Sequence, residues 1–299
     1  MKITKIERFI IYPILIGLLV LFAFFDLDIT HSLYNPESIF GRLGENLAEA
    51  PFQMLCVFAC LLLFKTRNKS SKGLDIGLGI LFMTLAIIFA GYSGGRVISY
   101  TKRYGWDASL QWPLAIAFGL FNFVVPALFA WKAKIEDRNK AIAISLFIVI
   151  MWILSFVLMN ALKFLWHRPR WRYLVTTEDP DAGFVPFYIL GCNGGFESNY
   201  ASFPSGHTIN AIGVISISLL GYCFPSLDKS AFPLRLFAYV WAILCAISRI
   251  IMGAHFASDV TAGFFVGFLL FDLMSTFFLP FFVKKTNEII SKSKAKTSN

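Results

Sequence analysis

Long apolar runs alternate with short polar segments along this chain. Four runs contain no charged residue, at 9–25, 76–95, 108–131 and 141–162. A helix of roughly 20 apolar residues crosses a hydrocarbon layer of ~30 Å, so each run predicts a membrane-spanning helix. Shorter or partly charged runs extend the pattern to about eight spans: 9–25, 50–64, 76–98, 112–131, 141–163, 205–224, 236–254 and 259–283.

This pattern predicts an all-α fold, a polytopic transmembrane helical bundle. The first run follows Lys2, Lys5 and Arg8 and could be mistaken for a secretory signal. No small-residue cleavage site follows it, so we interpret it as a retained helix. Hydrophobic residues make up 57% of the chain and charged residues only 15%. A soluble core could not bury that much apolar surface.

The distribution of positive charge predicts the orientation. Of the 27 Lys and Arg residues, 18 fall in the N-terminus, the C-terminus and alternate loops, and 9 fall in the other loops. Cytoplasmic segments carry the excess of Lys and Arg, so both termini are expected to be cytoplasmic. The net charge of +9 is therefore a topology signal, and we expect no nucleic acid partner. The five Cys residues indicate no disulfide framework.

A basic cluster follows the fifth predicted span. Lys163, Arg168, Arg170 and Arg172 lie within ten positions, and Pro169 disfavours helix at the residue before it. Such a cluster can bind an anion. Taken alone, it could equally be a collar of basic side chains that reach toward lipid headgroups.

The second cluster is Pro204-Ser205-Gly206-His207 at the start of the sixth predicted span. The first turn of a helix has unpaired backbone N–H groups and a positive dipole end, which together bind phosphate oxygens. A histidine in that turn can give a proton to a leaving oxygen. Without its neighbours, His207 would more often be structural.

The third cluster ends the seventh predicted span and contains Ser248, Arg249, His255 and Asp259. A charge at the end of an apolar run needs an anionic partner, which Arg249 could find in a substrate. A spacing of four places the Asp259 carboxylate beside the His255 imidazole in a helical turn, where it can orient the ring. A structural Arg–Asp pair is the alternative. The predicted topology brings all three clusters to the outer face.

These residues resemble the three-part signature of the type-2 phosphatidic acid phosphatase superfamily, in its membrane-bound lipid phosphatase branch. Pro-Ser-Gly-His is complete at 204–207, and Ser-Arg, His and Asp match at 248–249, 255 and 259. The first part, Lys followed after six residues by Arg-Pro, is imperfect. Lys163 and Arg170 have the spacing but Trp171 replaces Pro, so Arg168, which does precede Pro, remains a rival ligand.

The resemblance implies a site and a domain division. His255 would form a phosphohistidine, Asp259 would hold its ring, and His207 would protonate the leaving oxygen. Phosphate would be bound by Lys163, Arg170, Ser205, Gly206 and Arg249, with no metal and no cofactor. Family members usually have a six-helix core, which we expect at 74–283, after a two-helix addition at 1–73 and before a basic cytoplasmic tail at 284–299.

The predicted function is hydrolysis of a phosphate or pyrophosphate monoester of a lipid at the outer face, in a bacterial cytoplasmic membrane. Undecaprenyl pyrophosphate is the first choice, then phosphatidate, phosphatidylglycerol phosphate or a lipid A phosphate. Alternatives are phosphoryl transfer between lipids, or a non-catalytic lipid transporter or binding protein on the same bundle. The membrane spans argue against a soluble haloperoxidase-like use. The pattern leaves three features open: the oligomeric state, the partner of Asp272, and the 173–202 loop as a lid or a connector.

Overall fold

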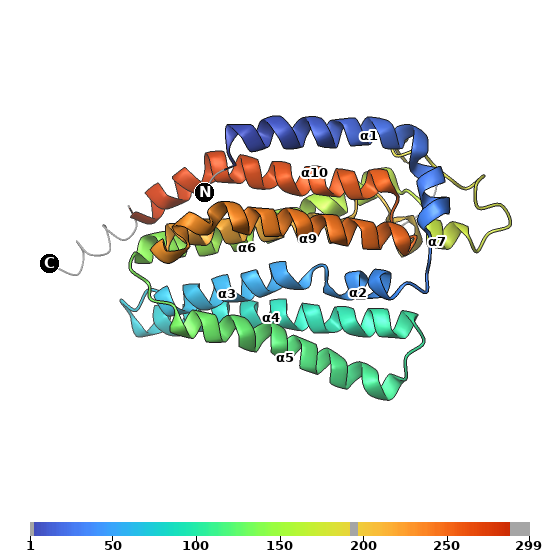
Figure 1. Ribbon diagram of the computed structural model, residues 1–299. Coiled ribbons are helices and arrows are strands. Elements are labelled where there is room, and N and C mark those ends of the chain that lie inside the picture. Colours follow the sequence, from blue (N-terminus) through green and yellow to red (C-terminus); the bar gives the residue numbers. More distant parts are fainter. Residues whose placement is uncertain (1–2, 192–196, 288–299) are drawn as a thin grey trace.

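The computed structural model describes residues 3–191 and 197–287, and within them the chain is helical without strands (Figure 1). The α-helices are α1 (Lys5–Leu33), α2 (Ile39–Leu47), α3 (Ala50–Thr66), α4 (Lys72–Arg103), α5 (Ala108–Lys132), α6 (Arg138–Trp166), α7 (Trp171–Leu174), α8 (Gly206–Gly213), α9 (Ala231–Ile251) and α10 (Ala257–Leu273). Short 3₁₀ segments are η1 (Ser198–Tyr200), η2 (Val214–Tyr222) and η3 (Pro225–Ser230), and η4 (Met274–Phe278) is a π-helix. The predicted all-α, polytopic bundle is confirmed.

Seven helical stretches in the described residues are long and apolar enough to cross a membrane: Lys5–Leu33, Ile39–Thr66, Lys72–Arg103, Ala108–Lys132, Arg138–Trp166, Pro225–Ile251 and Ala257–Asn287. The remaining predicted span, 205–224, corresponds to α8 and η2, a shorter stretch that changes from α to 3₁₀ geometry at Val214. All eight residues of α8 are buried. This stretch is therefore an interior helix, enclosed by the longer ones.

Two boundaries differ from the prediction. The second span begins at Ile39 rather than 50, as α2 followed by α3, because the pattern placed Glu45 and Glu49 in a loop. In the fold both carboxylates are buried and face guanidinium groups, of Arg103 and Arg96 respectively. The last helix continues to Asn287, into the predicted basic tail, and residues 288–299 of that tail lie outside the described residues.

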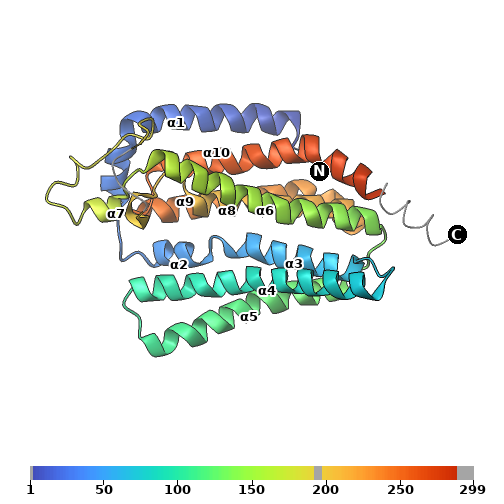
Figure 2. The ribbon, with the colours of Figure 1, turned by 180° about the vertical axis from the view of Figure 1, so that it is seen from behind.

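The helices form layers with α3 near the centre. It packs against α4, α5 and α6, while α1 lies along α10 and α9 on the other side of the bundle (Figures 1 and 2). In the most apolar 18-residue stretch of the second span, 72% of the residues are buried, whereas in the corresponding stretch of α1 only 11% are buried. Large apolar side chains such as Phe9 and Trp131 point outward and are 83% and 84% exposed. Such an apolar outer surface suits contact with lipid tails.

Ion pairs fasten α1 to the rest of the bundle. Arg8 binds Asp272 of α10 (Nη2–Oδ1 2.7 Å), which supplies the partner that the sequence could not name for this carboxylate. Glu7 pairs with Arg235 of α9 (Nε–Oε1 2.7 Å), and both side chains are largely buried. Removing one partner of a buried pair costs about 3–5 kcal/mol, so α1 is an integral part of the packing. The division at residue 73 stays a prediction.

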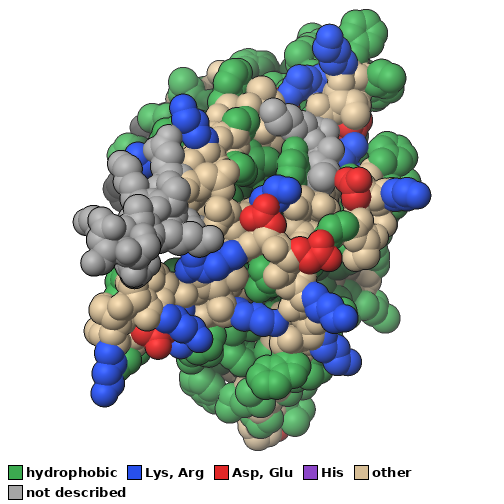
Figure 3. Space-filling view, turned by 90° about the vertical axis from the view of Figure 1, so that its left-hand side faces the viewer, with side chains coloured by type: hydrophobic (Ala, Val, Ile, Leu, Met, Phe, Trp, Pro, Cys, Tyr) green, Lys and Arg blue, Asp and Glu red, His purple; other side chains and the backbone are tan. Residues whose placement is uncertain are grey.

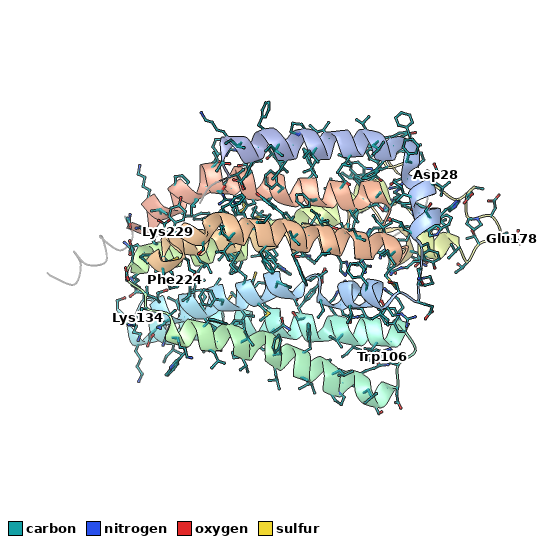
Figure 4. The ribbon with its side chains drawn as sticks, in the orientation of Figure 1. Asp28, Trp106, Lys134, Glu178, Phe224 and Lys229 are labelled. Carbon is teal, nitrogen blue, oxygen red and sulfur yellow. The ribbon has the colours of Figure 1, made fainter. Side chains whose placement is uncertain are left out.

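The polar segments sort to two ends of the bundle. Figure 4 places Asp28, Trp106 and Glu178 at one end and Lys134, Phe224 and Lys229 at the other. The second end, where α1 begins and the last helix finishes, carries many Lys and Arg side chains and fewer acidic ones (Figure 3). The predicted inner and outer loops thus lie at opposite ends, and which end faces the cytoplasm stays a prediction from charge.

Candidate active site

The three sequence clusters meet at one end of the bundle, near α7 (Figure 1). The first follows the end of α6, where His167 adopts a left-handed conformation (φ 45°) and terminates the helix just before Arg168, as Pro169 predicts. The second starts α8, and the third occupies the turn between α9 and α10. The imidazole rings of His207 and His255 lie 6.5 Å apart, centroid to centroid.

His255 is held with one nitrogen engaged. Its ring is 1% exposed, and its Nδ1 lies 2.6 Å from the backbone carbonyl of Ser202. A carbonyl oxygen can only accept, so this bond requires the proton on Nδ1 and leaves the lone pair on Nε2. Burial lowers the pKa of His255 well below its usual value, and the positive charges of Arg170, Lys163 and Arg249 lower it further. The ring is therefore neutral near pH 7, as a nucleophile requires.

Asp259 acts on His255 less directly than predicted. Its Oδ2 lies 3.9 Å from His255 Nδ1, too far for a hydrogen bond. The same oxygen accepts from the hydroxyl of Ser202 (2.5 Å) and from the backbone N–H of Phe256 (2.8 Å). Asp259 thus fixes Ser202, whose carbonyl in turn orients the imidazole. The expected direct contact is replaced by a relay through one residue.

Arg168 is fully buried and committed to protein oxygens. Its guanidinium donates to Asp259 (2.6 Å), to Asp26 of α1 (2.9 Å) and to the carbonyl of Val185 (2.7 Å). The hydroxyl of Ser258 completes the set (2.8 Å). These bonds occupy nearly all of its N–H groups. As a correction to the sequence analysis, Arg168 braces the Asp259 carboxylate and is not placed as a rival phosphate ligand.

Ser205 is the N-cap of α8. Its hydroxyl accepts from the backbone N–H and the hydroxyl of Thr208, so its own proton remains available to donate. The backbone N–H of Ser205 is used by the carbonyl of Asp259 (2.9 Å), so the cradle of free N–H groups begins at Gly206. A Cβ at Gly206 would collide with the sulfur of Met159 on α6. A larger residue at position 206 would therefore require the flexible Met159 side chain to move.

The predicted phosphate-binding cations surround the histidines. Lys163 and Arg170 both donate to the carbonyl of Ala201. Arg249 is fully buried and donates through Nη2 to Glu45 (2.7 Å), while its Nε and Nη1 find no hydrogen-bond partner among the described residues. Burial and the charges of Arg172 and Arg249 lower the pKa of Arg170 to about 9. A site this positive favours a bound anion.

Four other side chains of this end were missed by the sequence analysis. Glu45 accepts from Arg103 (2.8 Å), Arg172 (3.1 Å) and Arg249, and is 1% exposed. Tyr100 and Arg96 of α4 reach His207. Asp26 was also missed. The sequence does indicate that an acidic residue beside an apolar run, such as Glu45 or Asp26, needs a basic partner, because an unpaired charge there is unfavourable. It does not indicate which basic residue that partner is.

The 173–202 loop packs against the clusters. The indole of Trp166 donates to the carbonyl of Phe187 (2.5 Å) and stacks on Phe203 at 4.7 Å. Cys192 and the rest of 192–196 lie outside the described residues, and the choice between lid and connector stays open. A separate cavity of about 770 Å³ lies between α3, α5 and η2, and none of the predicted site residues lines it. Among the described residues, no group of three or more His, Cys, Asp or Glu is arranged to hold a metal.

Comparison with known proteins supports the resemblance. Phosphatidylglycerophosphatase B of Bacillus subtilis (strain 168) is 43% identical over 84 residues, which are 27% of this chain and 40% of that protein. The chain therefore matches well under two thirds of that relative's length. No solved structure matches. The family model of the PAP2 superfamily matches from α6 into the last helix. Residues 142–282 of this chain thus match the PAP2 superfamily.

Proposed function

We propose that this chain is a metal-independent membrane phosphatase that hydrolyses a phosphate or pyrophosphate monoester of a lipid. The observation that carries the proposal is Arg249, a fully buried guanidinium with two nitrogens unpartnered among the described residues, beside two neighbouring imidazoles. A buried cation with free N–H groups needs an anion. Phosphate fits because its oxygens accept several such bonds at once.

The first step would be attack by Nε2 of His255 on phosphorus, which forms an N–P bond and breaks the bond to the lipid oxygen. His207 would give that oxygen a proton from the opposite side of the phosphate. An in-line arrangement needs about 3–3.5 Å from nucleophile to phosphorus and about 2.6–3.2 Å from acid to leaving oxygen. A ring separation of 6.5 Å is of this order.

The charge on the transferring phosphoryl group would be stabilised by Lys163, Arg170 and Arg249, with the Ser205 hydroxyl and the Gly206 amide. Removing one contact of this kind typically lowers the rate about 100–1,000-fold, by analogy with oxyanion holes. Water would then cleave the phosphohistidine, with His207 now accepting a proton, and release inorganic phosphate.

The substrate would enter from the membrane at the end of the bundle that carries the site. The excess of Lys and Arg at the other end supports an outer active site and cytoplasmic termini in a bacterial cytoplasmic membrane. Undecaprenyl pyrophosphate remains our first choice of substrate. The name of the Bacillus subtilis relative adds weight to phosphatidylglycerol phosphate.

The test is phosphate release by the purified full-length chain in detergent. The panel is undecaprenyl pyrophosphate, phosphatidate, phosphatidylglycerol phosphate and a lipid A phosphate, compared by kcat/KM. His255→Ala is expected to abolish release, and His31→Ala is the matched control because its ring lies at the same end but is 44% exposed. Equal release by wild type and His255→Ala would overturn the mechanism. Release from none of the lipids would overturn the activity.

A further inference from the structure

His207 is contacted by a helix that lies outside the matched domain. The hydroxyl of Tyr100 on α4 lies 2.5 Å from Nε2 of His207, and the two rings are 5.9 Å apart. Tyr100 is 2% exposed, so water does not compete for this hydroxyl. The contact therefore fixes which nitrogen of His207 is engaged by protein.

Arg96, one turn before Tyr100, sets the direction of the hydrogen bonds. Its Nη2 contacts the oxygen of Tyr100 and lies 3.3 Å from Nε2 of His207, and its Nε lies 3.2 Å from Glu49. A guanidinium only donates, so the tyrosine oxygen accepts from Arg96 and turns its own proton toward Nε2. Nε2 must then be an acceptor. The neutral ring consequently carries its proton on Nδ1.

We propose that Tyr100 is a positioning residue for the acid of the reaction. Its hydroxyl group holds Nε2 and fixes the plane of the ring, so that Nδ1 is directed to the leaving oxygen. The acid step starts from the doubly protonated ring: Nδ1–H passes to the leaving oxygen, and neutral imidazole remains with its proton on Nε2, where the Tyr100 oxygen accepts from it. Tyr100 touches no reacting atom in this role and acts only through His207. The inference rests on the proposed function, and it extends the site to α4, which neither the sequence clusters nor the matched domain includes.

The test uses leaving groups of different basicity. An alkyl phosphate such as phosphatidate needs a proton on its departing oxygen, whereas an aryl phosphate such as p-nitrophenyl phosphate departs without one. General acids typically contribute 10²–10⁴-fold, so loss of correct positioning in Tyr100→Phe is expected to lower kcat for phosphatidate about 10–100-fold. For the aryl ester the expected loss is under about threefold, and KM for both should hold.

Tyr92→Phe is the matched control. It removes the same hydroxyl from the same helix, at a ring that packs edge-on against Trp152, and should leave both rates unchanged. A second variant guards against misfolding: Tyr100→Phe combined with His207→Ala should be no slower on phosphatidate than His207→Ala alone.

The outcomes separate cleanly. Equal losses of Tyr100→Phe on both substrates, or a double variant slower than His207→Ala, would overturn the positioning role and leave the phosphatase activity standing. Unchanged rates in Tyr100→Phe would overturn it as well. A wild-type protein that releases phosphate from none of the four lipids of the panel would overturn the proposed function, and this inference with it.

Discussion

Replacing Arg249 by Lys should separate phosphate binding from structural ion pairing. Arg249 is fully buried, donates to Glu45 through Nη2, and keeps Nε and Nη1 without a partner among the described residues. A lysine ammonium can serve one acceptor set but not both, because it is a point charge without the fork of a guanidinium. Hydrogen bonds to charged groups contribute about 1.5–3 kcal/mol each, so one lost bond to phosphate lowers kcat/KM about 10–150-fold.

The assay is initial-rate phosphate release, with thermal unfolding measured in the same detergent. The folded state should tolerate the change, because Glu45 retains Arg103 and Arg172. Arg103→Lys is the control: it alters the same carboxylate cluster from a side chain that is 40% exposed, and should change kcat/KM less than about threefold. Equal losses in both variants would show that pairing with Glu45 matters and would refute phosphate binding by Arg249.

Three further predictions follow from the same contacts. The reaction needs neutral His255, whose pKa is lowered, so the acid limb of kcat/KM against pH should lie below 6.5. Arg170→Gln removes one of the positive charges that lower this pKa and should move the limb to higher pH. A limb above 6.5 in the wild type would contradict this. Activity should persist in EDTA, and loss on chelation that magnesium restores would disprove metal independence. Asp26→Asn should destabilise the protein by about 1–3 kcal/mol and lower kcat/KM, because Arg168 loses its charged partner on α1. Asp28→Asn, at an exposed position of the same helix, should do neither. Equal unfolding midpoints for the two variants would count against a bracing role of Asp26.

The sequence pattern predicted the fold class correctly because a membrane helix is defined by the length of its apolar run, which is a local property. The pattern did not predict the placement of buried charged residues. Glu45 and Glu49 looked like loop residues because a lone carboxylate is excluded from an apolar run, yet guanidiniums from α4 face both of them. Such partners are distant in the chain, and periodicity carries no information about them.

The sequence predicted which residues lie at the site better than it predicted the hydrogen bonds between them. His207 and His255 could be assigned to one face because helix ends alternate across a membrane, and their ring centroids do lie 6.5 Å apart. The spacing of four between His255 and Asp259 suggested direct contact on a helix. In the fold α10 begins only at Ala257, so His255 lies before the helix, and Ser202 comes between the two side chains.

The roles of Arg168 and Tyr100 could not be read from the sequence for a different reason. Arg168 and Arg170 are the same residue type, and only the fold places the carboxylates of Asp26 and Asp259 around the guanidinium of Arg168. Tyr100 belongs to a helix with no motif, and its meaning comes from a contact with a residue 107 positions away. Tertiary packing selects among chemically similar side chains.

In the proposed mechanism, the phosphoryl group passes from the lipid to His255 before it reaches water. The most direct measurement is rapid quenching of the reaction with radiolabelled substrate under alkaline conditions, followed by mapping of the labelled peptide. We expect an acid-labile phosphate on the peptide that contains His255, formed before product and absent in His255→Asn. Label on another residue, or a full first turnover of phosphate release with no labelled protein, would contradict it.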